Sequence, residues 1–254
     1  MKNIAVVTGA TSGFGKAIAE ELASHHYNLI ITGRRADRLH ALRESLENTY
    51  GIACRALVFD VRSMKETVNA FASLQSEWME VEVLINNAGL ALGRDSIESG
   101  VLDDWNAMID TNIKGLLHVT KVISPNMVKR KFGTIINIGS IAGRQPYAGG
   151  NVYSATKYAV DGLTHSMRID LAPHSVRVCQ IAPGAAETEF SVVRFHGDQS
   201  KADAVYIGFD PLTARDIAET VWFMVSRPAH VTIQDVLIMP TSQPTASIIH
   251  RRSN

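Results

Sequence analysis

Tyr153 and Lys157 are the residues of this chain whose types and spacing most directly suggest chemistry. They are four positions apart in a segment, 151–171, whose pattern predicts a helix, so both side chains should share one helix face. A tyrosine holds its proton to a pH of about 10, and a nearby ammonium group lowers that pKa. The pair could therefore exchange a proton with a substrate oxygen. A solvated helix face without chemistry is the alternative.

A glycine-rich turn near the N-terminus predicts a dinucleotide-binding site. Residues 3–8 (NIAVVT) fit a short buried parallel strand, residues 9–15 (GATSGFG) follow it, and a helical pattern comes next. Glycines let the backbone turn tightly and approach a pyrophosphate, while the free N–H groups of the helix start can bind phosphates. A plain strand-to-helix turn is the alternative.

The end of the second predicted strand favours NADP over NAD. Residues 28–32 run into Gly33, Arg34 and Arg35, with no carboxylate at this point. A site for NAD usually places Asp or Glu there to bond the ribose hydroxyls. Two guanidinium groups suit a ribose that carries a 2′-phosphate. If Arg34 and Arg35 only cap a loop, the missing carboxylate has no explanation.

The elements that must position these residues alternate between strand and helix along the whole chain. Strands are expected at 3–8, 28–32, 53–59, 81–86, 134–138, 176–181 and 234–239. Helices are expected at 14–26, 36–49, 64–78, 102–131, 151–171 and 213–226, with Pro125 kinking or dividing the fourth and Thr213 as N-cap of the last. This alternation predicts an α/β Rossmann fold, a single domain over 1–254, with a doubly wound seven-stranded parallel sheet and helices on both faces.

The candidate functional residues fall directly after the predicted strands, where doubly wound sheets bind ligands. They are Gly9, Arg34, Asp60, Asn87, Ser140 and Pro183. This regularity predicts one cleft at the carboxyl edge of the sheet.

Several motifs resemble, in order and spacing, the short-chain dehydrogenase/reductase family. They are Thr8-Gly9-x-x-x-Gly13-x-Gly15, residues 86–89 (NNAG), Asn112, Ser140 and Tyr153-x-x-x-Lys157. The resemblance covers essentially the whole chain. More narrowly, residues 86–93, 146–153, 188–195 and 228–231 look like the bacterial NADP-dependent 3-hydroxy acid (serine or allo-threonine) dehydrogenases.

The resemblance implies a role for each motif. Tyr153 would be the general acid/base, Lys157 would lower its pKa and hold the nicotinamide ribose, and Ser140 would bond the substrate oxygen. Asn112 would hold a water that links Lys157 to solvent; a helix residue bonding backbone is the alternative. The cofactor residues expected from the glycine turn, the arginines and the resemblance are Gly9, Thr11, Ser12, Gly13, Phe14, Gly15, Arg34, Arg35, Asp60, Val61, Asn87, Ala88, Gly89, Tyr153, Lys157, Pro183, Gly184 and Thr188.

The substrate is expected to lie under the segment 189–210, interpreted as a mobile lid. Together with Ser140 and Tyr153, Arg194 is the candidate for binding a substrate, because a guanidinium can bind a carboxylate bidentately. Arg194 could instead be a surface residue or a subunit contact, and Arg144 is a second candidate.

The resemblance implies an NADP-dependent enzyme that interconverts a short 3-hydroxy acid, of the serine, allo-threonine or 3-hydroxypropionate type, and its 3-oxo acid or semialdehyde. A carbonyl or ketone reductase of the same fold with a different substrate stays open. So does a non-catalytic NADP-binding sensor, although the intact catalytic set argues against it.

Composition argues against other classes of partner. The 25 basic and 25 acidic residues balance, which gives no sign of a nucleic-acid or membrane surface. No signal peptide or membrane span of ~20 apolar residues is recognisable. Cys54 and Cys179 are isolated, and no metal-ligand spacing occurs, so a reducing compartment, the cytoplasm, is expected. By resemblance, we expect a homotetramer or homodimer formed through the helices at 102–131 and 151–171.

Overall fold

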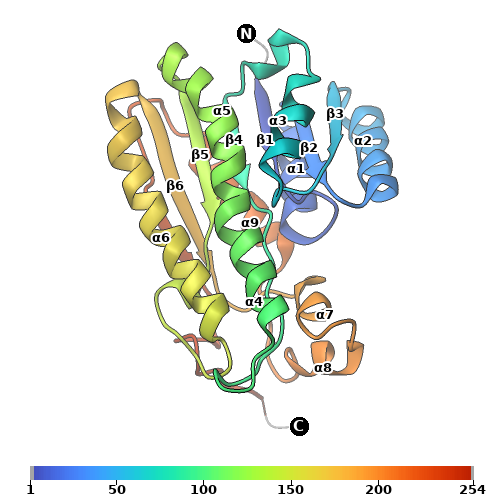
Figure 1. The fold of residues 1–254 in the computed structure, drawn as a ribbon, viewed down its shortest axis with the longest axis vertical. Helices are drawn as coiled ribbons and strands as arrows, with labels where there is room; N and C mark the ends of the chain where they lie inside the picture. The colour runs from blue at the N-terminus through green and yellow to red at the C-terminus, as the bar shows by residue number, and fades with distance from the viewer. Residues whose placement is uncertain (1–2, 253–254) are drawn as a thin grey trace.

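Seven short apolar runs form one parallel sheet in the computed structural model, which describes residues 3–252 (Figure 1). The strands are β1 Ile4–Val7, β2 Asn28–Gly33, β3 Cys54–Val58, β4 Val83–Asn86, β5 Gly133–Ile138, β6 Val176–Pro183 and β7 Asp235–Ile238. They lie in the order β3-β2-β1-β4-β5-β6-β7. The chain therefore winds outward in both directions from β1 and β4, which confirms the predicted Rossmann fold.

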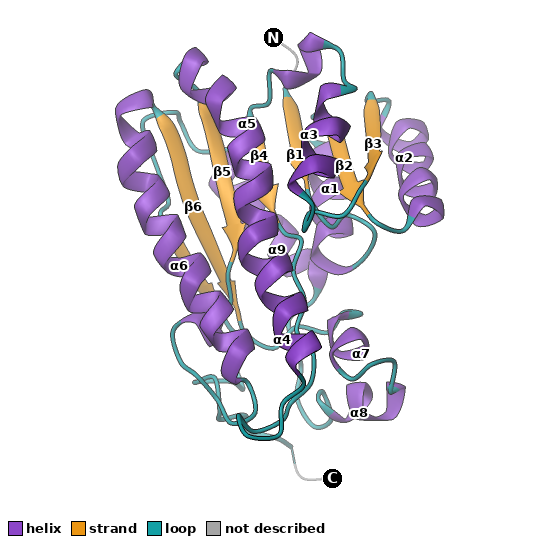
Figure 2. Ribbon diagram, in the orientation of Figure 1, coloured by secondary structure: helices purple, strands orange, loops and turns teal. Residues whose placement is uncertain are grey.

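Helices cover both faces of this sheet (Figure 2). The helices of the described residues are α1 Gly13–Ser24, α2 Ala36–Tyr50, α3 Met64–Ala72, α4 Leu102–Ile109, α5 Leu116–Arg130, α6 Asn151–Leu171, α7 Phe190–Arg194, α8 Gln199–Ala204 and α9 Ala214–Val225. Of these, α7 and α8 lie beyond the carboxyl ends of the strands and not on a face of the sheet. Successive strand side chains point to opposite faces. In β1, Ala5 and Val7 therefore pack toward α1, α2 and α9, while Ile4 and Val6 pack on the side of α3 and α5. Among residues 3–252, no helix is both long and apolar enough to cross a membrane.

The predicted helix at 102–131 is interrupted, but not at Pro125. A π-helical turn, Asp110–Gly115, separates α4 from α5. Pro125 lies inside α5. It is exposed there, as is Lys121, whose carbonyl loses its helical partner, so water can satisfy that carbonyl. Of the two effects predicted for Pro125, a kink or a division, the division was therefore wrong. The π turn instead lies at Asn112, a predicted site residue.

Two other helix boundaries follow from side-chain hydrogen bonds. The predicted helix at 64–78 ends at Ala72, and a separate 3-10 turn follows at Ser76–Met79. Ser73 Oγ donates to the carbonyl of Ala70 at 2.7 Å and so satisfies a carbonyl at the helix end. At α9, the N-cap predicted for Thr213 is confirmed, because its side chain forms a reciprocal capping box with Asp216.

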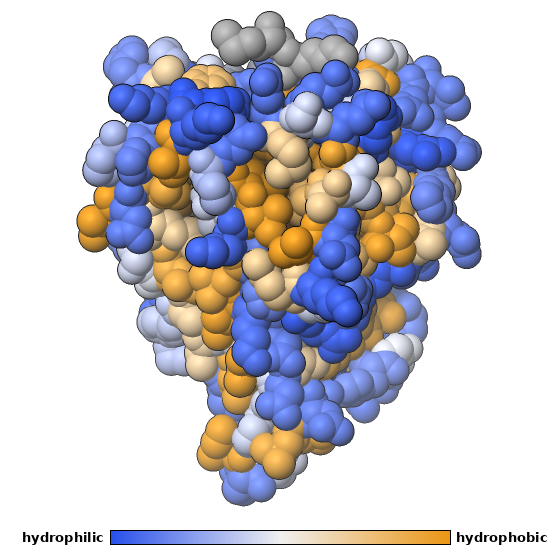
Figure 3. Space-filling view, turned by 45° about the horizontal axis from the view of Figure 1, so that its top comes forward, coloured by the Kyte–Doolittle hydropathy of each residue, from blue (hydrophilic) through white to orange (hydrophobic). Residues whose placement is uncertain are grey.

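Hydrophobic side chains also reach the surface between hydrophilic ones (Figure 3). The exposed apolar residues of the helices α4, α5 and α6 are Leu102, Ile109, Leu117, Tyr158 and Ile169. Exposed apolar surface on consecutive helices is typical of protein–protein contacts.

The chain after β7, for which the sequence predicts no role, packs onto its own subunit. The amide N–H of Ala185 donates to Gln243 Oε1 at 2.7 Å, and the side chain of Gln243 is buried. Further on, the amide of Arg252 donates to the carbonyl of Gly208 at 2.7 Å. The tail therefore ties the segment after β6 to the segment after α8.

We expect Gln243→Leu to lower the free energy of unfolding by about 1–3 kcal/mol, because it leaves the partly buried amide of Ala185 without its partner. Urea denaturation would measure this loss. Gln145→Leu is the matched control, since Gln145 accepts from Ala246 at an exposed position. Equal losses in the two variants would contradict the structural role of Gln243.

Candidate active site

The carboxyl ends of the strands open onto a cleft of about 460 Å³. Every cofactor residue predicted from the sequence lines it, with the exception of Gly15. Ser140, Tyr153 and Arg194 line it too, whereas Asn112 does not. The fold thus brings to one place predicted residues that are up to 185 positions apart in the chain, from Gly9 to Arg194.

The glycine turn after β1 is tight and closely packed. Gly9 has a φ of +66°, which favours glycine. Gly15 allows close packing behind the turn, since a Cβ there would lie 2.3 Å from the carbonyl oxygen of Gly9. The N-cap Ser12 makes no side-chain hydrogen bond to the start of α1, so the first N–H groups of the helix stay available to an anion.

Asn87 holds this turn against the end of β4. Its Nδ2 donates to the carbonyls of Thr8 at 2.7 Å and Gly9 at 3.2 Å. The neighbouring Asn86 is buried and donates to Thr120 of α5 and to Asn137 of the adjacent strand β5. Asn86 is therefore structural, while the side chain of Asn87 positions the glycine turn beside the cleft.

Charged groups meet at the far end of the cleft, after β2 and β3. Asp60 pairs with Arg62 at 2.6 Å and with Arg34 at 3.7 Å. Burial alone would raise the pKa of Asp60, but the hydrogen bonds and charge of Arg62, helped by Arg34, hold it below its usual value. Arg35 donates to the hydroxyls of Thr11 and Ser12 in the glycine turn. Arg34 and Arg35 therefore lie beside Asp60 at the wall of the cleft, where Arg35 also pairs with the carboxylate of Glu189 at 2.8 Å.

Tyr153 and Lys157 lie one helical turn apart in α6 and face the cleft, as their spacing predicts. Lys157 Nζ donates to the carbonyl of Ile138 at 2.8 Å and lies 5.9 Å from the Tyr153 ring centre. Burial lowers the pKa of Lys157 to about 8. Burial also raises the pKa of Tyr153, against a hydrogen bond from Ser140 and the charge of Arg194. The expected lowering by Lys157 is therefore not the dominant influence on Tyr153 in this structure.

Asn112 uses its whole amide group within the protein. Its Nδ2 donates to the Leu90 carbonyl at 2.9 Å and to Thr156 Oγ1 at 3.0 Å, and its Oδ1 accepts from the Leu90 amide at 2.8 Å. These contacts match the alternative reading, a helix residue that bonds backbone. Through them the π turn holds the loop after β4 beside Lys157: a Cβ on Gly89 would lie 3.2 Å from Asn112 Oδ1 and 3.7 Å from Lys157 Nζ.

Arg194 points into the cleft beside Tyr153. Its Nε donates to the Gly93 carbonyl at 3.2 Å, and its guanidinium lies 5.3 Å from the Tyr147 ring centre and 5.7 Å from that of Tyr153. Its Nη2 is buried and has no hydrogen-bond partner among residues 3–252. Arg144, the second candidate, instead pairs with Asp235 outside the cleft, so the structure rejects it.

The sequence profile of the short chain dehydrogenases matches residues 3–198. The chain belongs to this family. An NADP-dependent 3-hydroxy acid dehydrogenase, YdfG of Salmonella typhi, is 46% identical over 250 residues, 98% of this chain and 99% of the relative. Sulfoacetaldehyde reductase 2 of Chromohalobacter salexigens is 43% identical over 244 residues, 96% of each. The closed form of a serine dehydrogenase complexed with NADP+ superposes with a TM-score of 0.91 at 43% identity, covering 98% of this chain and 100% of that one.

This short-chain dehydrogenase has cleft residues that sequence reasoning missed. One is Arg94, whose guanidinium lies 5.9 Å from the Tyr147 ring centre. Others are Gln243, Ala246 and Ile249, which belong to the tail after β7. Arg94 lies eight residues beyond the end of β4, in a segment that follows a strand and so borders the cleft. The tail carries no motif, and only its path in the fold brings it to the cleft.

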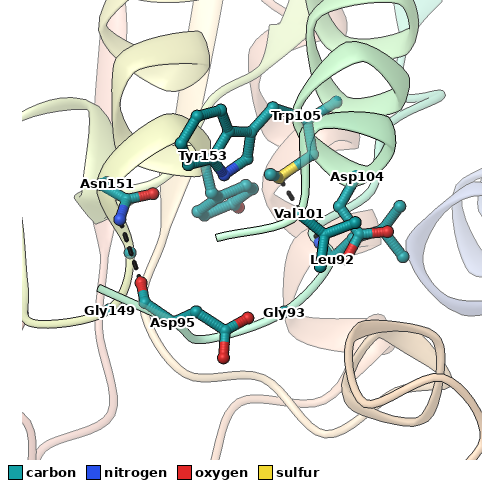
Figure 4. Close-up of a pocket in the computed structure, with 11 residues that line it drawn as sticks. Leu92, Gly93, Asp95, Val101, Asp104, Trp105, Gly149, Asn151 and Tyr153 are labelled. Carbon is teal, nitrogen blue, oxygen red and sulfur yellow. Dashed lines mark hydrogen bonds between the residues drawn. The ribbon is translucent and has the colours of Figure 1, made fainter. Parts of the chain in front are cut away.

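A second hollow in this dehydrogenase is also lined by Tyr153 (Figure 4). Asp95, Asp104, Trp105 and Asn151 are among its walls, and Asn151 Nδ2 donates to the Asp95 carbonyl at 3.0 Å. Its volume is about 10 Å³. That is near the limit for a single water molecule, so a substrate must use the larger cleft.

Proposed function

We propose that this protein is an NADP-dependent oxidoreductase that interconverts a short 3-hydroxy acid and its 3-oxo acid or semialdehyde. The observation that carries the substrate class is the buried, unpartnered Nη2 of Arg194, beside Tyr153 in the cleft. A buried donor without a partner is costly, and a carboxylate would satisfy it. The names of the relatives, a 3-hydroxy acid dehydrogenase and a serine dehydrogenase with NADP+, support the same assignment.

The cleft residues fit the two ends of an NADP molecule. The glycine turn and the start of α1 would hold the pyrophosphate, and Arg34 and Arg35 would bind the 2′-phosphate. Asp60 would accept a hydrogen bond from the adenine amino group, and Thr188 would bond the nicotinamide carboxamide. When bound, the cofactor supplies the hydride acceptor or donor.

The protein's own part is to move a proton and to orient the substrate. In the oxidising direction, the phenolate of Tyr153 takes the proton of the substrate hydroxyl; in reduction, the phenol returns it. Ser140 bonds the same oxygen and stabilises the charge that develops on it. Lys157, when protonated, favours the phenolate and bonds the nicotinamide ribose. The guanidinium of Arg194 holds the substrate carboxylate, so that C3 of the substrate, the carbon that bears the reacting oxygen, faces the cofactor.

We expect Arg194→Ala to raise the KM for a 3-hydroxy acid by roughly 10- to 100-fold, the range of a hydrogen bond to a charged group. The KM for a neutral aldehyde should change by less than about threefold, because no such hydrogen bond is lost. Arg194→Lys is the matched control, since it keeps the charge but loses the fork. Steady-state kinetics with both substrates measure the difference, and equal effects on both would reject the carboxylate role.

The function itself is tested by following NADPH oxidation with malonic semialdehyde and NADP reduction with L-serine, L-allo-threonine and 3-hydroxypropionate. NAD(H) and a neutral aldehyde are run in parallel. Turnover with NADP(H) and confined to the acids supports the proposal. Turnover with the neutral aldehyde alone would replace the substrate class with that of a carbonyl reductase, and no turnover with any carbonyl would favour a non-catalytic sensor.

A sulfonate substrate is the second candidate, because one relative is named a sulfoacetaldehyde reductase. A guanidinium can bind a sulfonate as it binds a carboxylate. Sulfoacetaldehyde is therefore compared with malonic semialdehyde at equal concentration. A larger kcat/KM for sulfoacetaldehyde would leave the anion-binding role of Arg194 unchanged. It would replace the 3-oxo acid with a sulfonate aldehyde as the assigned substrate.

We also assign a lid role to segment 189–210, which comprises α7, α8 and their connections. It contacts the opposite wall of the cleft where the amide of Gly93 donates to the Arg194 carbonyl at 3.0 Å.

For assembly, we propose a homodimer or homotetramer through α4, α5 and α6, which carry exposed apolar residues including Leu102 and Ile169. Sedimentation of the purified protein would test the assembly.

A further inference from the structure

One carboxylate, that of Glu189, joins the arginines after β2 to the start of α7. Arg35 Nη1 donates to Glu189 Oε2 at 2.8 Å, and Arg38 Nη1 donates to both carboxylate oxygens, at 2.7 and 3.0 Å. Arg35 is the N-cap of α2 and Arg38 lies in its first turn, so both side chains start from the same end of the helix. Glu189 also lines the cleft. Two guanidinium groups therefore converge on a single anion at the wall of the cofactor cleft.

The other donors of Arg35 hold its side chain in place. Its Nε and Nη2 donate to Thr11 Oγ1 at 3.0 and 2.7 Å, and Nη2 also donates to Ser12 Oγ at 2.7 Å. One side of the guanidinium is thus anchored on the glycine turn, and the other side faces an anion. In this structure Glu189 is that anion, and it occupies donors of Arg35, which is proposed to bind the 2′-phosphate.

The ion pairs of Glu189 are of the kind that a stronger anion can displace. The side chains of Arg35, Arg38 and Glu189 are 42%, 53% and 45% exposed, so water screens their attraction. The hydrogen bond from Arg35, followed by those from Arg38, holds the pKa of Glu189 below its usual value, so the carboxylate is charged at neutral pH. A phosphate monoester offers three acceptor oxygens and a charge of about −1.5 to −2. It should therefore win the competition for the same donors.

We propose that Glu189 competes with the 2′-phosphate for Arg35 and Arg38, and so sets how strongly the enzyme prefers NADP(H) over NAD(H). The inference rests on the proposed use of NADP. NAD(H) has no phosphate at that position and leaves Glu189 on the arginines. NADP(H) must first displace the carboxylate, so Glu189 weakens its binding, whereas Arg38 joins Arg35 on the phosphate and strengthens it.

The test compares Glu189→Gln with the unaltered enzyme in direct binding. We expect the Kd for NADPH, measured by fluorescence, to fall by about three- to tenfold, in line with the loss of two exposed ion pairs. The Kd for NADH should stay within about twofold, since NADH contacts neither arginine through a phosphate. Calorimetry with adenosine 2′,5′-bisphosphate should reproduce the gain, and adenosine 5′-monophosphate should not. Glu187→Gln is the matched control, because Glu187 is an exposed carboxylate on the same segment.

A double-mutant cycle tests the part assigned to Arg38. Arg38→Ala should weaken NADPH binding, and Glu189→Gln should gain less in that background, since one of the contested donors is gone. Weaker NADPH binding by Glu189→Gln, or equal shifts for NADPH and NADH, would overturn the inference. If the unaltered enzyme binds NADH as tightly as NADPH, it is instead the proposed cofactor that fails, so the two failures are distinguishable.

Discussion

Replacing Tyr153 by phenylalanine is expected to lower kcat by about 10²- to 10⁴-fold, the usual contribution of a positioned general acid/base. The binding of NADPH should change little, because the substitution removes only the hydroxyl group. The aromatic ring, which is buried and lies 5.7 Å from that of Phe190, keeps its packing. Single-turnover kinetics and a fluorescence titration with NADPH measure the two effects separately.

Tyr147→Phe is the matched control for this prediction. Tyr147 also lines the cleft and also carries a phenolic hydroxyl, but the proposed mechanism gives that hydroxyl no proton to carry. Its removal should leave kcat within about threefold, since no acid/base contribution is lost. Substantial turnover by Tyr153→Phe, or equal losses in both variants, would reject the proton chemistry assigned to Tyr153.

Replacing Lys157 by methionine is expected to abolish most turnover and yet to stabilise the fold. The side chain of Lys157 is 7% exposed, and burial lowers its pKa from 10.5 to about 8. A shift of this size corresponds to a penalty of up to about 3 kcal/mol at neutral pH. The hydrogen bond to Ile138 offsets part of it, so we expect Lys157→Met to raise the free energy of unfolding by about 1–2 kcal/mol at pH 7.

The pH dependence of this gain has a definite sign. Between pH 8 and pH 10.5 the unfolded chain binds the Lys157 proton and the folded chain does not, so stability rises with pH across that window. The penalty is complete below pH 8 and fades above it. Urea denaturation at pH 7 and pH 10 should therefore give a larger advantage for Lys157→Met at pH 7. Lys65→Met, at an exposed position, is the control, and a Lys157→Met variant less stable than the unaltered protein at pH 7 would contradict the argument.

Functional sites that cost stability are common, because the environment that tunes a catalytic group is unfavourable for folding. Here the same burial that lowers the pKa of Lys157 also raises that of Tyr153. At neutral pH Tyr153 stays an uncharged phenol in both states, so its raised pKa costs no stability. Arg194 Nη2, which has no partner among residues 3–252, is therefore the second unfavourable group in the cleft. Ligand binding would relieve these costs, so we interpret the cleft as organised for its ligands at the expense of the free protein.

The amino-acid sequence by itself determined the fold and the position of the cleft. Strand and helix periodicity are local properties, and parallel strands place their carboxyl ends at one edge of the sheet. Residues directly after strands, such as Gly9, Arg34 and Ser140, therefore had to meet there, whatever their partners. The helix that carries Tyr153 and Lys157, Asn151–Leu171, has the predicted bounds because its apolar pattern is regular and no proline interrupts it.

Only the tertiary structure decided which polar groups pair across the cleft. Arg144 and Arg194 were both candidates, and the packing places the first on Asp235 and the second beside Tyr153. The contact of Arg35 with Glu189 joins residues 154 positions apart. The periodicity of apolar residues predicts which face of a helix or strand is buried. It does not predict which residue of a distant segment will contact that face. Such contacts depend on the path of the whole chain, and they decide the chemistry proposed here.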